Sequence, residues 1–547
     1  MKKRNLFWII PTGLLVTLLL ISLFGHLFSP AKAKPLVQKQ KDTSDLITPE
    51  QMKKDLSYLK YYFENVYIGY DFLIEKGFDI DKICDEIYKK TIKDANNSKK
   101  ISKSTFMSNI KQLVMKDFDF MDMHFSLGGQ QCKNQQTLYF SDIYIREKDT
   151  ASGKKYYVYK NEREPYPEDI KKNMNFLPPA EVKPGQEYTG PIENLYPCFD
   201  GKELVYRFCV FTSQNIQKVY ISVDGQKVWA PVLPSLNISN GQQYQGFKET
   251  KDTAYFSMSA FNFDEGSNFE VRGRQEFNKM CENAKNHVRG KKNIIIDLRN
   301  NGGGKTLYRN VFFANMMYYN TELTTDIMDI VGTIGEEDEK RLISPPICQV
   351  YRRRYKYQIK NYFKKLKFKK DKVTYAYEIF EKQQDKRWNK VNILHSLACG
   401  FIPYRKLIDD KTFVSNEKIL PPTDFKGDIY ILTNRNSASC SEYSMALAYA
   451  FDKMDGITVH QIGENTCGAV SYVNPLSLIL PYSGFWLYIP TAYNNSQDFN
   501  HPAYHGEGFG WYPEYWTSSF NISNTLQNLI DDPDLAEMLK GIERHHL

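Results

Sequence analysis

The sequence predicts an α/β protein in which a helical part and a small β-rich part precede the α/β region. From residue 253 onward, strand-like apolar runs alternate with helical patterns, as they do in α/β layers. Residues 49–66 instead carry apolar side chains at helical spacing, and residues 132–247 hold short β-rich runs between turn residues. With 547 residues, 42% of them hydrophobic, the chain is long enough for two or three domains with separate cores.

The N-terminus predicts export. Three basic residues precede an apolar run from Leu6 to about Phe24, and small residues at 31–33 form a candidate cleavage site. The run is also long enough to span a bilayer, so we interpret residues 1–33 as either a signal peptide or a membrane anchor. Both interpretations place the body of the protein outside the cytoplasm, in a periplasmic, cell-surface or extracellular location.

Residues 45–130 are expected to form a helical domain. Thr48 is a candidate N-cap, Pro49 suits the first helical position, and Gln51 completes a capping box. A second helix is expected near residues 103–115. Residues 131–250 then predict a β-rich domain, because short β-rich runs alternate there with Pro, Gly and Asn turns.

Residues 251–547 predict the α/β region. Its expected elements are a strand at 253–261, a helix at 269–288, a buried strand ending in a glycine turn at 293–304, and a strand at 428–434. A basic, tyrosine-rich helical insertion at about 335–415 interrupts the alternation.

The positive charge of the chain is concentrated in this insertion. The net charge is +8, yet residues 351–373 alone hold eleven Lys and Arg against one Asp. We interpret the insertion as a solvated helical face, with a membrane-surface or acidic-partner site as the alternative. An exported chain has little access to nucleic acid, so no nucleic-acid partner is expected.

Three serines lie between a predicted strand and a predicted helix: Ser437, Ser439 and Ser441. Glu442 follows Ser439 by three residues, so these two can form a capping box at the helix start. A serine there has unpaired N–H groups and the positive end of the helix dipole beside it, which can stabilise an oxyanion. A helix cap without a catalytic role is the alternative.

Four segments of the chain read, in order, "NIIIDLRNNGGG", "YILTNRNSASCSE", "QIGENTCGAV" and "EGFGWYPE". Together they resemble the tail-specific or C-terminal processing serine peptidases, peptidase family S41. The resemblance covers about residues 45–127 and 250–547, and it extends neither to the β-rich region nor to a PDZ module. It implies a crotonase-like catalytic core. It also implies that Ser439 is the nucleophile, with the N–H groups of Gly303 and Cys440 as oxyanion-hole donors.

The base is not the lysine that the processing peptidases use, because Ala469 occupies that position. The chain looks like the tricorn-core branch, which lacks the serine–lysine dyad and takes a histidine from a D-x-H segment and a glutamate from an E-x-x-G-V-x-P-D pattern. The matching residues are Asp122 and His124 in "MDMHFSL", and Glu507 in "GEGFGWYPE", where Glu514 replaces the aspartate. Neutral His124 would take the proton from Ser439, and Glu507 would orient or support the site.

Other residues compete for these roles. His501 and His505 flank Glu507 and are rival bases, whereas His460 lies in a predicted core strand and is interpreted as structural. Cys440 adjoins the nucleophile, but nothing marks it as a thiolate, so we expect it to pack as a small apolar residue.

The sequence therefore predicts an exported serine endopeptidase that acts on protein or peptide substrates through an acyl-enzyme. No metal or cofactor is expected, because the chain has no H-E-x-x-H, Walker or dinucleotide motif. Membrane association through the N-terminal segment or the basic insertion is an additional expectation. The alternative function is a catalytically inactive ligand- or peptide-binding protein on the same fold.

Overall fold

The computed structural model describes residues 35–41, 43–118, 121–131, 137–163, 176–199, 203–212, 214–234, 246–262, 269–335, 339–350, 379, 405–409, 419–519 and 521–542. The N-terminal signal or anchor and the basic cluster at 351–373 lie outside these residues. Within the described ranges, no helix is both long and apolar enough to cross a membrane. The chain divides into two compact units. The first unit comprises Met1–Lys133, Glu336–Asn416 and Ser471–Gln497. The second unit comprises Asn134–Gly335, Glu417–Val470 and Asp498–Leu547.

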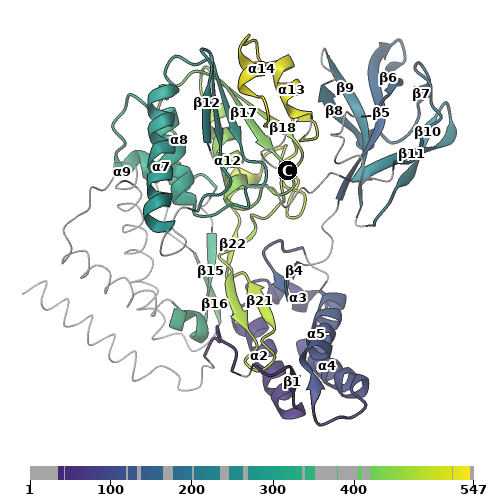
Figure 1. The fold of residues 1–547 in the computed structure, drawn as a ribbon, viewed down its shortest axis with the longest axis vertical. Helices are drawn as coiled ribbons and strands as arrows, with labels where there is room; N and C mark the ends of the chain where they lie inside the picture. The colour runs from purple at the N-terminus through teal and green to yellow at the C-terminus, as the bar shows by residue number, and fades with distance from the viewer. Residues whose placement is uncertain are drawn as a thin grey trace, which may run out of the picture. The chain divides into compact units, whose positions relative to one another are not determined.

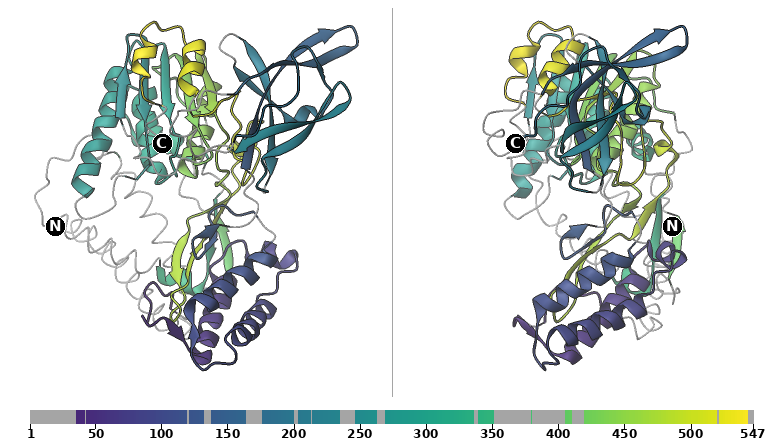
Figure 2. Two further views of the ribbon diagram at one scale, coloured as in Figure 1. Left: turned by 45° about the vertical axis from the view of Figure 1, so that its right-hand side comes forward. Right: turned by 90° about the vertical axis from the view of Figure 1, so that its right-hand side faces the viewer.

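The first unit is built on packed helices (Figure 2). The helices are α2 (Pro49–Asn65), α3 (Tyr70–Glu75), α4 (Ile80–Asp94) and α5 (Lys103–Asp117). The expected capping box forms at the start of α2, where Gln51 N donates to Thr48 Oγ1 over 3.3 Å and Thr48 N donates to Gln51 Oε1 over 2.9 Å. This local prediction is confirmed.

Three small sheets complete the first unit, in the orders β1-β2, β16-β15-β22-β19 and β20-β21-β3-β4. Their strands are β1 (Leu46–Ile47), β2 (Ile101–Ser102), β3 (Ser126–Leu127), β4 (Gln130–Gln131), β15 (Glu339–Ile343), β16 (Lys406–Asp409), β19 (Tyr472–Val473), β20 (Leu476–Ile479), β21 (Trp486–Ile489) and β22 (Ala492–Asn494). Residues 471–497 were expected inside the α/β region. They belong here because β21 pairs with β3 and because Leu478 and Leu487 pack into the core of the helices.

The second unit begins with a seven-stranded antiparallel sheet over residues 137–234, which we call the β domain. Its strand order is β11-β10-β7-β6-β5-β9-β8, and β11 also pairs with β5. The elements are β5 (Thr137–Thr150), β6 (Gly153–Asn161), β7 (Glu187–Tyr188), η1 (Ile192–Asn194), β8 (Leu195–Phe199), β9 (Leu204–Thr212), β10 (Lys218–Val223) and β11 (Gln226–Pro234).

The rest of the second unit is an α/β layer around a six-stranded sheet of order β12-β13-β14-β17-β18-β23. Its strands are β12 (Gly246–Glu249), β13 (Thr253–Ser257), β14 (Asn293–Asp297), β17 (Gly427–Thr433), β18 (Ile457–Gly463) and β23 (Tyr515–Trp516). All neighbouring pairs from β13 to β23 are parallel, and β12 runs antiparallel to β13. The helices are α7 (Phe269–His287), α8 (Thr306–Met317), α9 (Thr325–Thr333), α12 (Cys440–Asp452), η2 (Gln497–Phe499), α13 (Ile522–Leu529) and α14 (Leu535–Met538).

Helices cover both faces of this sheet (Figure 1). On one face Tyr255 and Leu432 pack against Ile522 of α13, and on the other Phe256 packs against Phe312 of α8 with ring centroids 5.4 Å apart. The chain is thus a mixed α/β protein, and the strands expected at 253, 293 and 428 form its central sheet. Because β14 and β17 are parallel neighbours, the segments that follow them meet at one edge of the sheet.

Candidate active site

The serine turn joins β17 to α12. Ser439 is the N-cap of α12, and its backbone has φ 54° and ψ −115°. A positive φ is uncommon for a residue with a β-carbon, and such strain of about 1–3 kcal/mol is found where a side chain must be held for function. The hydroxyl therefore lies at a constrained strand-to-helix turn, beside the N-terminal end of a helix.

The structure distinguishes Ser439 from the two serines beside it. Ser437 and Ser441 are fully buried, and their hydroxyls donate to the carbonyl oxygens of Leu298 and Asn301 over 2.8 and 2.7 Å. Ser439 is partly exposed. Of the three hydroxyls, only that of Ser439 belongs to a side chain that solvent reaches.

The glycine turn after β14 lies directly against the serine turn. Gly303 has φ 98°, and a β-carbon at this position would be 2.7 Å from Ser439 Cβ and 2.8 Å from Cys440 N. Ala438 N also donates to Asn301 O over 2.9 Å. The fold thus brings together Gly303 and Cys440, the two residues expected to supply the oxyanion hole.

The Gly303 donor is nevertheless occupied in this structure. Its N–H donates to Asn301 Oδ1 over 2.9 Å, and Asn301 Nδ2 donates to Met258 O. Asn301 is completely buried. In this structure a neighbouring amide side chain therefore satisfies the Gly303 N–H. The side chain of Cys440 is buried, at the first position of α12.

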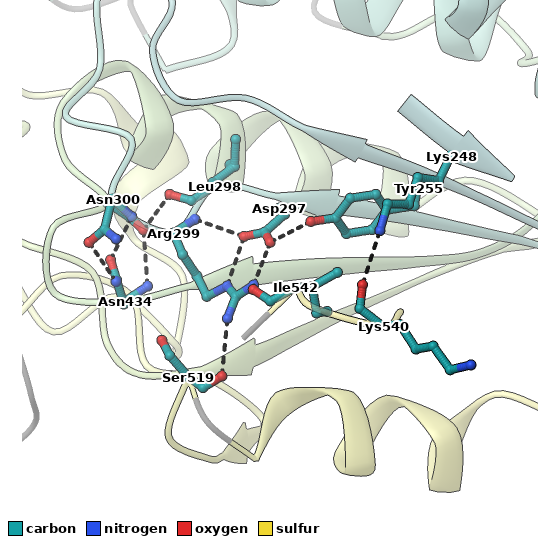
Figure 3. A network of polar contacts seen from close by, with 11 residues as sticks. Lys248, Tyr255, Asp297, Leu298, Arg299, Asn300, Asn434, Ser519, Lys540 and Ile542 are labelled. Carbon is teal, nitrogen blue, oxygen red and sulfur yellow. Dashed lines mark hydrogen bonds and ion pairs between the residues drawn. The ribbon is translucent and has the colours of Figure 1, made fainter. Parts of the chain in front are cut away.

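A polar network fixes both turns to the sheet (Figure 3). Arg299 donates to the Asp297 carboxylate through Nε over 2.9 Å and through Nη2 over 2.6 Å, and both side chains are fully buried. Tyr255 OH donates to the same carboxylate over 2.8 Å. The chain after β14 and the chain after β17 are joined by Asn300 and Asn434, whose backbone and side-chain groups bond each other over 2.9 Å.

Glu442 ties the serine turn to the loop that follows β18. Its buried carboxylate accepts from Ser439 N over 3.1 Å and from Thr466 Oγ1, Gly468 N and Ala469 N over 2.6–2.7 Å. Burial raises the pKa of Glu442 to about 7, although these four hydrogen bonds oppose the rise. The carboxylate thus positions the serine turn against this loop, and the N–H of Ala469 is one of its donors.

Glu507 lies in a loop packed onto that same segment. Its Oε2 accepts from Val470 N over 3.2 Å, and Gly508 N donates to Gly468 O over 2.8 Å. Trp511 N donates to Thr466 Oγ1 over 2.8 Å. The segments "QIGENTCGAV" and "EGFGWYPE", distant in sequence, are therefore bonded side by side.

His124 follows α5 in the first unit, whereas Ser439 and Glu507 belong to the second. Asp122 does not bind its imidazole, because Asp122 Oδ1 accepts from the backbone N–H groups of His124 and Phe125, each over 2.9 Å. Tyr67 OH donates to Asp122 Oδ2 over 2.9 Å. The aspartate thus shapes the backbone that carries the histidine.

The imidazole of His124 has one hydrogen-bond partner among the described residues. The imidazole bonds the backbone of Tyr472, while its buried Nδ1 has no hydrogen-bond partner among the described residues. Burial lowers the pKa of His124 to about 4, and the Tyr472 bond opposes this shift. Burial likewise raises the pKa of Asp122 to about 7. At neutral pH the imidazole is therefore uncharged, with one nitrogen lone pair unused.

The rival histidines are engaged elsewhere in the second unit. His501 stacks on Tyr449 with ring centroids 4.2 Å apart, and His505 stacks on Tyr512 at 3.7 Å. Burial lowers the pKa of both His501 and His505. His460 lies in β18, and its Nδ1 is 2.7 Å from a Glu514 carboxylate oxygen.

Within the described ranges, no cluster of three or more His, Cys, Asp or Glu side chains is arranged to hold a metal ion. The polar groups around Ser439 bond to one another and to backbone. The chemistry these residues can support is attack by a serine hydroxyl at a helix start, with charge stabilised by backbone N–H groups.

The second unit thus defines an α/β protein that presents a serine at a strained turn on one edge of its sheet. Residues 252–505 match the family model described as "Peptidase family S41". The match spans the glycine turn, the serine turn and the loop after β18, and ends just before Glu507.

Solved structures give weaker likenesses. The crystal structure of mature CPAF is 12% identical, with 91% of this chain and 97% of that chain covered and a TM-score of 0.42. The photosystem II D1 C-terminal processing protease is 13% identical, with 91% and 98% covered and a TM-score of 0.30. A lipoprotein from Streptococcus agalactiae is 14% identical, with 51% and 66% covered and a TM-score of 0.24. No curated protein matches the chain.

Proposed function

We propose that this chain is an exported serine endopeptidase that hydrolyses peptide bonds through an acyl-enzyme on Ser439. The proposal depends mainly on the exposure and hydrogen bonding of the three serine side chains. The hydroxyls of Ser437 and Ser441 donate to backbone carbonyl oxygens. Ser439 is partly exposed at a strained helix start, and Gly303 lies directly against it. The family match over residues 252–505 supports peptidase chemistry.

His124 is the proposed general base, as in a branch of the family without the serine–lysine dyad. Ala469 stands at the lysine position, so serine chemistry needs another proton acceptor. The lowered pKa of His124 keeps its imidazole neutral at pH 7, and the unpartnered Nδ1 is a lone pair that can accept a proton. The imidazole takes the Ser439 proton during attack and returns it to the leaving amine.

Glu507 and the oxyanion hole complete the proposed site. Glu507, anchored to Val470 N, supplies a carboxylate that supports the reacting groups electrostatically. The N–H of Cys440 at the start of α12 and that of Gly303 would bind the oxyanion. For Gly303 to donate, its N–H must first leave Asn301 Oδ1.

An inactive binding protein is the second candidate. Two observations favour it: Ala469 replaces the lysine, and the Gly303 donor is bonded within the protein. Neither removes Ser439, His124 or Glu507, so the peptidase is the function we propose.

The test is hydrolysis of a mixture of unstructured peptides by the purified chain. We expect Ser439→Ala to abolish cleavage, with little loss of stability because a single partly exposed hydroxyl is removed, at a capping cost of about 1 kcal/mol. Ser437→Ala is the matched control and should retain cleavage. Cleavage that persists in Ser439→Ala would refute the assignment, and tight peptide binding without cleavage by the wild type would favour the binding protein.

Location and domain layout are part of the same proposal. The basic residues and apolar run at residues 1–33 support export by a signal peptide or an anchor. The proposed layout has a helical domain at 45–130, a β-rich domain at 131–250 and the peptidase region at 251–547, of which residues 471–497 group with the helical unit. N-terminal sequencing of the mature protein tests the export proposal, since a start near residue 34 indicates a cleaved signal.

A further inference from the structure

The β domain contacts the segment that carries Glu507 through a cluster of aromatic rings, which we call the aromatic seam. Phe211, at the end of β9, stacks on Tyr512 with centroids 5.7 Å apart and an interplanar angle of 11°. Phe211 also meets Phe509 edge-on at 6.2 Å. Tyr196 of β8 packs against Trp516 at 4.8 Å. The two sides are joined in one apolar cluster that also includes Leu138, Phe140 and Cys209.

The conformation of Glu507 depends on its flanks. Gly506 and Gly508 adjoin it, with φ of 99° and 80°. Glycine adopts such conformations freely and does little to fix the residue between two of them. The conformation of the loop around Glu507 must therefore be fixed by contacts of residues other than these two glycines.

The aromatic rings contact the loop at His505 and Phe509, each two residues from Glu507. His505 stacks on Tyr512 at 3.7 Å, and Tyr512 is the residue on which Phe211 stacks. Phe509 contacts Phe211 directly. Aromatic pairs of this geometry contribute about 0.5–1.5 kcal/mol each beyond the area they bury. A domain about three hundred residues earlier in the chain thus holds both ends of the glutamate loop.

We propose that the β domain is a positioning element of the active site, with the aromatic seam centred on Phe211 holding the Glu507 loop. This inference rests on the proposed function only for its catalytic consequence. Phe211 contacts no reacting group, so it is a positioning residue rather than a catalytic one.

The first test needs no activity. Five backbone hydrogen bonds hold the loop, donated by the N–H groups of His505, Gly508, Phe509, Gly510 and Tyr512. Amide hydrogen exchange of residues 505–512 in Phe211→Ala is expected to be about tenfold or more faster than in the wild type, because opening the loop no longer breaks the stack. The matched control is Tyr220→Ala. Tyr220 is an exposed ring on β10 of the β domain, and it pairs with Trp229 on β11. Equal exchange in Phe211→Ala and Tyr220→Ala would overturn the proposal.

The second test separates positioning from general stability. Phe211→Ala should lower kcat about tenfold while KM stays within about threefold, and Phe211→Tyr, which keeps the ring, should restore kcat. Combined with Glu507→Gln, Phe211→Ala should add little further loss, since both act on one carboxylate. Losses that multiply would contradict the inference. A wild type without peptidase activity would refute the proposed function, while hydrogen exchange would still decide the role of the seam.

Discussion

A single methyl group at Gly303 provides a sharp test of how closely the two turns must approach. The β-carbon of Gly303→Ala would lie 2.7 Å from Ala438 O, 2.7 Å from Ser439 Cβ and 2.8 Å from Cys440 N. These neighbours are backbone atoms and a β-carbon, which cannot rotate away. Restoring an ordinary separation of about 3.5 Å to all three atoms requires the serine turn to move by roughly 0.8 Å. Alanine must also adopt a φ near 98°, at a cost of about 1–3 kcal/mol.

A displacement of this size at the nucleophile is expected to slow acylation of Ser439 by about a hundredfold, since misplacement by 1 Å costs about that much. The assay is the second-order rate of labelling by a fluorophosphonate probe. Two variants isolate the causes. Gly302→Ala meets no atom within 4 Å and has no positive φ, while Gly290→Ala has φ 77° but open space around it. We expect both to label at the wild-type rate.

Labelling of folded Gly303→Ala at a rate within threefold of the wild type would show that the close approach of the two turns is not needed. A loss of labelling rate in Gly302→Ala as large as that in Gly303→Ala would show the same. Circular dichroism and the thermal midpoint establish that each variant is folded.

Two further predictions concern pH and stability. Because burial lowers the pKa of His124 to about 4 and only the neutral imidazole accepts a proton, labelling of Ser439 should rise with pH to half its maximum near pH 4 and stay level above pH 6. A midpoint near 6.5 would indicate an exposed base. Asp297→Asn should lower the free energy of unfolding by about 3–5 kcal/mol in urea denaturation, because it leaves the Arg299 guanidinium buried without a counter-charge. Lys540→Ala, at an exposed pair with Glu537, should change stability little, and a loss in Asp297→Asn as small as that would contradict the assigned role.

Local signals in the sequence predicted local structure well. The cap of α2 depends on Thr48 and Gln51 alone, three residues apart, and it forms as expected. The strand-to-helix position of Ser439 likewise follows from an apolar run, a polar turn and Glu442. Such features are encoded within one turn of chain, so a pattern is enough to find them.

Features that join distant segments were beyond the sequence. The residues near Ser437 and Ser441 in the sequence do not indicate that these hydroxyls donate to carbonyl oxygens about 140 residues away. The hydrogen bond from Gly303 N to Asn301 Oδ1 joins residues only two positions apart, but it depends on a side-chain rotamer that the fold selects. A buried asparagine two residues before a glycine turn is the signal that could have suggested it.

The role of Asp122 was not predicted from the D-x-H spacing. Its Oδ1 accepts from the backbone N–H groups of His124 and Phe125. Aspartate often bonds backbone two residues on in this way. The grouping of residues 471–497 with the helices was missed because the pairing of β21 with β3 spans about 360 residues.

Ser439 alone of the three serines is the proposed nucleophile. Digestion of the fluorophosphonate-treated chain, with location of the adduct by tandem mass spectrometry, tests this assignment. One adduct is expected, on Ser439, formed by the wild type and Ser437→Ala but not by Ser439→Ala. An adduct on Ser437, Ser441 or Cys440, or a folded wild type that forms none, would contradict it.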